Sequence, residues 1–258
     1  MSEGLFRVAV HVSAERAEEA RARALELAPG GFEESEAAGT LILVFYAPAA
    51  AAEAIASAFP NPEITPVEPG WEDRWRSFHR PARAGGLWIG PPWEHPDPEE
   101  LAVVIDPGRA FGTGAHPTTR LCVELLARAG RGSLLDVGCG SGVLSIAAAR
   151  LGFDPIVAID VDPVAVETTI ANAAANGVEV EAYVLDGEEA ELPRADVAVA
   201  NVLLAPVERI LARLDSGVAI TSGYLVADMP AAPGRGHVDR VELDGWAADM
   251  FTAAPLPG

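Results

Sequence analysis

Lysine is absent from this sequence: all 18 basic residues are arginine, and they stand against 38 acidic residues. The formal net charge at pH 7 is −20, and no basic cluster outweighs the acidic residues. Proteins that bind nucleic acids usually present a basic surface, because contacts to phosphate dominate their affinity. The composition predicts no direct nucleic-acid binding. It favours a basic protein or a small cation as partner, or a soluble acidic protein without one.

Long hydrophobic segments and cysteines are also scarce. No apolar run approaches 18 residues, so we expect no membrane-spanning helix. Residues 1–4 lack the positive region that precedes the apolar run of a secretory signal, so none is expected. The two cysteines, Cys122 and Cys139, have no metal-ligand spacing between them. We interpret them as reduced thiols of a cytoplasmic protein that holds no metal.

The chain has 258 residues, half of them hydrophobic, which suits one large domain or an ordinary domain with a small one. The first 67 residues have the pattern strand, helix, strand, strand, helix, strand. The expected strands are 5–12, 32–37, 40–46 and 63–67, and the expected helices are 14–27 and 49–58. This order is typical of a ferredoxin-like α+β domain, which we place at residues 1–67.

Residues 68–100 are predicted to be a linker with a short helix and an edge element. Trp71, Trp75 and Phe78 stand at positions i, i+4 and i+7, which is one face of a helix. A helix that packs on a neighbouring element explains these aromatic residues without any further function.

Residues 101–258 alternate between expected strands and helices, which is typical of a mostly parallel sheet with helices on both faces. The expected strands are 133–137, 156–160, 180–185, 197–200 and 218–222, followed by a hairpin of 238–243 and 246–252. The expected helices are 117–129, 143–151, 164–176 and 207–214. The pattern predicts an α/β fold with a Rossmann-like sheet of seven strands.

A glycine-rich turn follows strand 133–137. Gly138, Gly140 and Gly142 permit a tight turn and a close approach of a ligand, in the crevice where α/β proteins bind nucleotides. The dinucleotide fingerprint has its third glycine one residue later, where this chain has Val143, so a nicotinamide-dependent dehydrogenase is disfavoured. A ligand without phosphate, such as S-adenosylmethionine, fits better, and Asp136 could attract its ammonium group. Glycines that merely shape a turn are the alternative.

Acidic residues follow the next two strands. Asp160 ends strand 156–160, where a carboxylate can accept hydrogen bonds from both hydroxyls of a ribose. Asp186 ends the third strand, where the adenine edge would lie. With the glycine turn, these acids predict a site for S-adenosylmethionine.

The segment before helix 117–129 contains two glycines and is expected to form a loop that folds over the cofactor. Pro117 suits the first position of the helix. The hydroxyl of Thr118 or Thr119 can bind the carboxylate of the cofactor. We assign Thr119, together with Phe111 and Thr113 of the loop, to the cofactor site.

Two residues are candidates for the reaction itself. Asn201 follows strand 197–200, and its amide oxygen can accept a hydrogen bond from an incoming amine, or its side chain can hold the methionine moiety. We assign it to catalysis and to cofactor binding, with a polar cap of the strand as the alternative. His116 could be a general base, although a lone histidine in a loop is more often structural or a helix cap.

These segments resemble the bacterial methyltransferases of ribosomal protein L11. The resemblance rests on the Phe-Gly-Thr-Gly-x-His-Pro-Thr-Thr loop at 111–119, the Asp-Val-Gly-Cys-Gly-Ser-Gly turn at 136–142, Ile-Asp-Val-Asp-Pro at 159–163 and Ala-Asn-Val-Leu at 200–203. Trp71, Trp75 and Pro81 of the linker and the small N-terminal unit are similar as well. The resemblance covers most of residues 70–222, and the loop at 111–119 is its most specific part.

The resemblance implies a class I S-adenosylmethionine-dependent methyltransferase at residues 101–258. It would trimethylate lysine side chains and the N-terminal amine of ribosomal protein L11, which the small domain would bind. Thr119, Gly138, Asp160 and Asn201 would contact the cofactor, and we expect a cytoplasmic monomer. Members of the family usually have a helix between residues 223 and 236, which the prolines and glycines of this chain make doubtful.

Two alternatives stay open from the sequence: methylation of a lysine in another protein, and a binding module that has the fold without catalysis. An adenine or glutamine methyltransferase is disfavoured. Such an enzyme would carry Asn-Pro-Pro-Tyr from residue 201, where this chain has Asn-Val-Leu-Leu.

Overall fold

The computed structural model describes residues 5–13, 32–37, 40–67, 80–106 and 114–253, together with single positions between 16 and 28. The chain forms two compact units, which divide between Phe78 and His79. The predicted linker helix, with Trp71 and Trp75, lies outside the described residues. Within the segment that we predicted to be linker and edge element, residues 82–84 and 87–90 form strands of the second unit.

The first unit contains one antiparallel sheet with the strand order β2-β3-β1-β4. Its strands are β1 (Leu5–Ser13), β2 (Glu33–Ala37), β3 (Thr40–Pro48) and β4 (Glu63–Pro66), and its second helix is α2 (Ala49–Ser57). Within the expected first helix, Ala20 and Ala24 are helical and buried. Val10, Leu43 and Ile55 belong to the core of this unit. The predicted ferredoxin-like arrangement is confirmed.

The second unit contains a sheet of seven strands with the order β10-β9-β8-β11-β12-β14-β13. The first five are parallel where they pair, and β14 pairs antiparallel with β12 and β13. The strands are β8 (Leu134–Val137), β9 (Ile156–Asp160), β10 (Glu181–Val184), β11 (Ala195–Asn201), β12 (Ser216–Leu225), β13 (Arg235–Leu243) and β14 (Trp246–Ala253). The predicted Rossmann-like sheet is therefore confirmed. None of the helices in the described part of the chain is long and apolar enough to cross a membrane.

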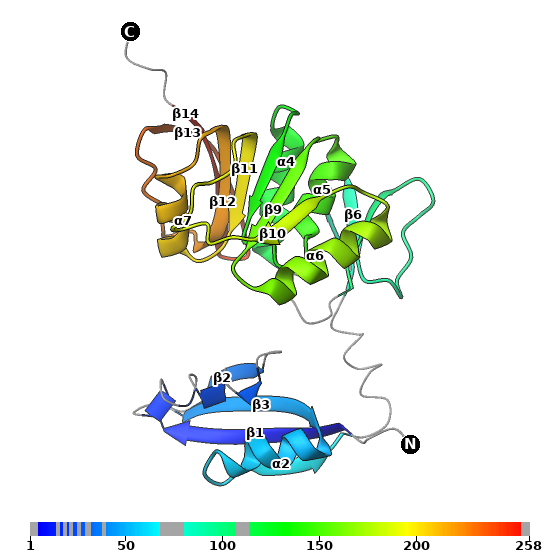
Figure 1. Ribbon diagram of the computed structural model, residues 1–258, viewed down its shortest axis with the longest axis vertical. Coiled ribbons are helices and arrows are strands. Elements are labelled where there is room, and N and C mark those ends of the chain that lie inside the picture. The colour runs from blue at the N-terminus through cyan, green and yellow to red at the C-terminus, as the bar shows by residue number, and fades with distance from the viewer. Residues whose placement is uncertain are drawn as a thin grey trace. The chain divides into compact units, whose positions relative to one another are not determined.

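Helices cover the two faces of this sheet unequally (Figure 1). The helices α4 (Pro117–Arg128), α5 (Val143–Leu151) and α6 (Pro163–Asn176) share the main core with one face. A three-stranded sheet lies over them, made of β5 (Ala82–Ala84), β6 (Leu87–Gly90) and β7 (Leu101–Val104). On the other face, α7 (Leu204–Leu211) is the one helix in the described residues.

Two predictions concern the segments on either side of β12: the start of α7 and the connection between β12 and β13. We expected the helix to begin at Val207, but it begins three residues earlier, at Leu204. The first turn of a helix tolerates proline because its N–H groups have no intrahelical partner, so Pro206 lies inside α7. The doubt about a helix between β12 and β13 is confirmed, since residues 226–234 form turns and no helix.

The junction between β8 and α5 depends on a buried carboxylate. Asp136 is 1% exposed, and its Oδ2 accepts hydrogen bonds from the backbone N–H of Ser145 at 3.1 Å and from the Ser145 hydroxyl at 2.6 Å. Burial raises the pKa of Asp136 to about 6, against the lowering effect of the two bonds from Ser145. The same side chain thus holds the start of α5 and carries a charge that the interior disfavours.

Because the pKa of Asp136 is higher in the folded than in the unfolded chain, protonation of this group favours folding. Its contribution is complete below about pH 4 and is lost as the pH rises through about 6. From pH 8 to pH 5.5, this group should stabilise the protein by about 1 kcal/mol. The variant Asp136→Asn keeps an acceptor for Ser145 but does not titrate, so its free energy of unfolding in urea should lack this gain.

The exposed, 65% accessible side chain of Asp215 offers a matched control. The difference in unfolding free energy between wild type and Asp215→Asn should stay constant over the same pH range. If the free energies of unfolding of wild type and Asp136→Asn also differ by a constant amount over this pH range, the carboxylate ionises in the folded protein without loss of stability. Our account of Asp136 is then wrong.

Candidate functional site

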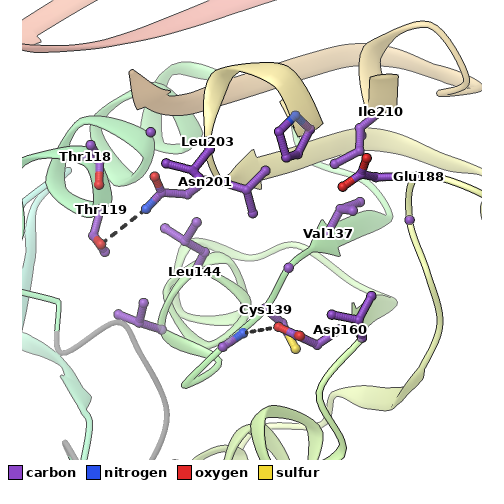
Figure 2. Close-up of a pocket in the computed structure, with 18 of the residues that line it drawn as sticks. Thr118, Thr119, Val137, Cys139, Leu144, Asp160, Glu188, Asn201, Leu203 and Ile210 are labelled. Atoms are coloured by element: carbon purple, nitrogen blue, oxygen red, sulfur yellow. Dashed lines mark hydrogen bonds between the residues drawn. The ribbon is translucent and has the colours of Figure 1, made fainter. Parts of the chain in front are cut away.

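A cavity of about 500 Å³ lies at the carboxyl ends of the parallel strands. Its lining comes from the turn after β8, the ends of β9 and β11, the start of α4 and the first residue of β14. Figure 2 shows Thr119 and Asn201 on one side of it and Asp160 and Glu188 on the other. Apolar walls with a few converging polar groups are typical of a small-molecule site.

The glycine turn forms the floor of this cavity. Gly138 and Gly140 line it, and both have positive φ, 77° and 55°. A Cβ on Gly138 would lie 2.6 Å from Cγ1 of Val202, so a larger residue would not fit. Gly142 does not line the cavity; a Cβ there would lie 2.9 Å from the side chain of Thr169 on α6. Two of the predicted glycines therefore face the cavity, and the third closes the turn against a helix.

Asp160 is positioned by the backbone on both of its oxygens. Oδ2 accepts a hydrogen bond from the N–H of Gly140 and Oδ1 accepts one from the N–H of Asp162, each at 3.0 Å. An ionised carboxylate has about four acceptor positions, so each oxygen can accept a further bond from a ligand in the cavity. Asp186 also lines the cavity and is exposed, and its Oδ1 accepts a bond from the N–H of Glu188 at 2.8 Å.

On the other side, Asn201 and Thr119 meet although 82 residues separate them. The Nδ2 of Asn201 donates to Oγ1 of Thr119 at 3.4 Å, as Figure 2 shows. Thr119 is buried in the first turn of α4, and Asn201 is half-buried at the end of β11. With its N–H₂ group directed at Thr119, the amide of Asn201 has its oxygen available as an acceptor.

His116 is used as a helix cap. Its Nδ1 accepts a hydrogen bond from the N–H of Thr118 at 3.4 Å and lies 2.8 Å from the Thr118 hydroxyl, so it caps α4. Burial lowers the pKa of His116, which keeps the ring neutral at pH 7. Its ring also packs edge-on against Trp246 at 5.0 Å between centroids. These contacts support the interpretation of His116 as a structural residue that caps α4.

Trp246 and Gly223 line the cavity, and sequence reasoning missed both. Trp246 is far from the motifs in the chain, and one aromatic residue at the start of a strand has no periodic signal. Gly223 has a φ of 104°, and a Cβ there would lie 1.9 Å from the carbonyl oxygen of Val202. Only glycine allows β12 to approach the segment after Asn201 so closely.

Other residues that we assigned lie elsewhere or cannot be placed. Asp136 does not line the cavity but lies buried beneath the turn, and its Oδ1 has no hydrogen-bond partner among the described residues. Phe111 and Thr113 lie outside the described residues. Cys139 lines the cavity, but burial raises the pKa of its thiol to about 12, so it is no nucleophile at pH 7. Across the described part of the chain, no group of three or more histidine, cysteine or acidic side chains could hold a metal.

The chain is similar to a family described as ribosomal protein L11 methyltransferase, whose sequence profile matches residues 50–230. A ribosomal protein L11 methyltransferase of Yersinia pseudotuberculosis is 43% identical over 185 residues, which cover 67% of this chain and 62% of the relative. One from Pectobacterium atrosepticum is 42% identical over 196 residues, covering 72% and 63% of the two chains. The chain thus spans somewhat less than two thirds of the length of these relatives.

A solved structure agrees with these sequence relationships. A ribosomal protein L11 methylase from Lactobacillus delbrueckii subsp. bulgaricus superposes with a TM-score of 0.60 and 27% sequence identity. The match covers 66% of this chain and 96% of that structure. Sequence profile, relatives and structure agree, and the chain belongs to the ribosomal protein L11 methyltransferase family.

Proposed function

We propose that the protein is an S-adenosylmethionine-dependent methyltransferase that methylates amines of ribosomal protein L11. The observation that carries the proposal is the arrangement of the cavity, with Asp160 on one side and the Thr119–Asn201 pair on the other. Family membership supports it, since the relatives are named for this reaction. One cavity of about 500 Å³ thus offers hydrogen-bonding groups both for a nucleoside and for the amino-acid end of a ligand.

The lining fits this cofactor group by group. The oxygens of Asp160 would accept bonds from the ribose hydroxyls, and Asp186 lies where the adenine edge would be. The apolar side chains of Val161, Leu185 and Ile210 would contact the adenine faces. The unpartnered Oδ1 of Asp136 adds negative charge beneath the turn, which favours the cofactor's cationic end.

When bound, the cofactor would supply a methyl group on a positively charged sulfur. The protein must then hold an amine in line with that methyl group at about 3 Å and keep its lone pair free. The amide oxygen of Asn201 would accept a hydrogen bond from the amine, which turns the lone pair away from the amide. Leu203 and Trp246 would exclude water, and an apolar site disfavours the ammonium form of a lysine.

No dedicated base is required by this arrangement. Asp160 and Glu188, which line the cavity, lie on the side opposite Asn201 (Figure 2), and the Nδ1 of His116 is engaged as a helix cap. A lysine has an ordinary pKa of about 10.4, so the proton must leave before transfer. We propose that it leaves to solvent as the amine enters the apolar part of the cavity.

We further propose that lysine side chains and the N-terminal amine are trimethylated. Each transfer replaces one hydrogen of the amine nitrogen with a methyl group. The trimethylated nitrogen has no lone pair left to attack a further methyl group, so transfer ends at that stage. The residues 1–67 would recognise the substrate protein, with residues 68–100 as the linker. The enzyme would act as a cytoplasmic monomer without binding nucleic acid, as its net charge of −20 favours.

Mass spectrometry of purified ribosomal protein L11 should test the reaction directly. Incubation with this protein and S-adenosylmethionine should add mass in steps of one methyl, up to three on each modified amine. No gain in mass, with calorimetry showing that the cofactor binds, would mean another protein substrate. No gain and no cofactor binding would favour a binding module without catalysis.

Replacement of Asn201 should separate chemistry from folding. Asn201→Ala removes the acceptor for the amine, and we expect kcat to fall about 100-fold, comparable to the loss of one catalytic hydrogen bond. Thr119→Ser keeps the hydroxyl that Asn201 contacts, so it should change kcat less than about threefold. Single-turnover methylation of the two variants gives the comparison. Equal rates for Asn201→Ala and wild type would remove Asn201 from the mechanism.

Two variants of His116 should distinguish a helix cap from a general base. Asn is a good helix N-cap, so His116→Asn should keep both stability and the methylation rate. His116→Ala should lose about 1 kcal/mol of stability, through the lost cap, with little loss of rate. Rates as a function of pH, together with thermal melts, provide the readout. A large loss of rate in both variants at full cofactor binding would assign the base to His116.

A further inference from the structure

A second cavity, of about 330 Å³, lies outside the proposed active site. It is formed between α4, β5 and β13, and three arginines line it: Arg83, Arg120 and Arg128. The acids in its lining are Glu124 and Glu242. Three guanidinium groups around one cavity are unusual in a chain with more than twice as many acids as arginines.

Two of the three arginines are already paired. Arg83 binds both oxygens of Glu100, at 2.5 and 3.1 Å, and Arg128 binds Asp239 at 2.9 Å. Each of these pairs satisfies its guanidinium at the edge of the cavity. Neither arginine therefore needs a ligand.

Arg120 differs from both. Its Nε is buried and has no hydrogen-bond partner, and its guanidinium forms no ion pair with any described residue. Glu124, four residues further along α4, is the partner that helix geometry offers. However, Oε1 of Glu124 accepts a hydrogen bond from the N–H of Gly85 at 2.7 Å, which fixes the turn between β5 and β6. The Oε1 of the other acid, Glu242, is held by Arg240 at 3.1 Å.

Unmade hydrogen bonds of a partly buried guanidinium are costly, and a carboxylate matches its fork of N–H groups with two parallel bonds. The cavity therefore offers unpaired guanidinium donors of Arg120 to a carboxylate supplied from outside the described chain. A neutral acceptor would satisfy fewer of these donors and would gain no charge assistance.

The position of Arg120 connects this cavity with the reaction. Arg120 directly follows Thr119, which lines the proposed active site. On the facing hairpin, Leu243 lines the second cavity and is paired in register with Trp246, which lines the first. The start of α4 and the end of this hairpin thus separate two neighbouring cavities.

We propose that Arg120 binds an Asp or Glu side chain of the protein substrate, close in sequence to the amine that is methylated. This inference rests on the proposed function. Thr119 and Arg120, which line the two cavities, are adjacent in the chain, and an extended peptide advances about 3.3 Å per residue. We therefore place the acid within about four residues of the amine. The subsite would select among lysines by the acid beside them, and it would act on substrate binding rather than on methyl transfer.

The test compares Arg120→Gln, Arg120→Lys and the control Arg194→Gln in methylation of ribosomal protein L11. Arg194 is 86% exposed and paired with Asp215, so its replacement removes one charge from the same unit away from both cavities. We expect Arg120→Gln to raise KM for the protein substrate about five-fold, with kcat and the Kd for S-adenosylhomocysteine unchanged. Arg120→Lys should restore part of the loss, and Arg194→Gln should match wild type.

A second arm identifies the partner carboxylate. Each Asp and Glu of the substrate within about four residues of a modified amine is replaced by its amide. One such change should raise KM as much as Arg120→Gln does, and the two changes together should cause no further rise. Additive effects for every acid, or an unchanged KM for Arg120→Gln, would overturn the inference. So would a loss of kcat or cofactor affinity, since Arg120 would then act through α4.

The two proposals fail in different ways. If wild-type protein methylates ribosomal protein L11 but Arg120→Gln does so with the same KM, the subsite is wrong and the proposed function stands. If wild-type protein transfers no methyl group to ribosomal protein L11, the proposed function fails, and the subsite for that substrate fails with it.

Discussion

The parallel pairing of β8 with β9 and β11 is the constraint on which the site depends. Val137 is in register with Ile159 on one side and with Ala200 on the other. The next residues along the three strands are Gly138, Asp160 and Asn201, which therefore emerge at one edge. The N–H of Gly138 continues the ladder to the carbonyl of Ile159 at 2.8 Å, so the turn begins without any loss of pairing. The polar contacts that Asp160 and Asn201 make in the cavity are built on this shared edge.

This constraint explains which parts of the site could be predicted from the sequence. Glycines in a turn and polar residues at the ends of neighbouring strands are local signals, and the residues to which they pointed, Gly138, Asp160 and Asn201, line one cavity. The contacts of Trp246 and Gly223 come from the antiparallel pairing of β12 with β14, which brings distant segments together. No spacing in the chain records such pairing, so these walls could not be predicted.

Asp136 illustrates a different limit of sequence reasoning. The pattern placed an acid beside the glycine turn, and we assigned it to the ligand. The structure uses that acid first to hold Ser145 at the start of α5, with one oxygen left unpartnered beneath the floor of the cavity. A carboxylate with both roles is costly to bury, which is why its pKa is raised. The sequence alone shows that an acid stands at this position. It does not show whether the acid holds the start of α5 or contacts a ligand.

The unequal covering of the sheet has a consequence for how the molecule opens. The glycine turn and Asp160 lie next to helices enclosed between two sheets, where opening exposes much apolar area. The connection of residues 226–234 is held instead by hydrogen bonds from Arg240 to the carbonyls of Val226 and Asp228, with little apolar packing. Local opening is easiest where buried area is small. Gly223 and Trp246 flank that connection and its hairpin, so their wall of the cavity is built on the more yielding half, and the wall of Gly138 and Asp160 on the rigid half.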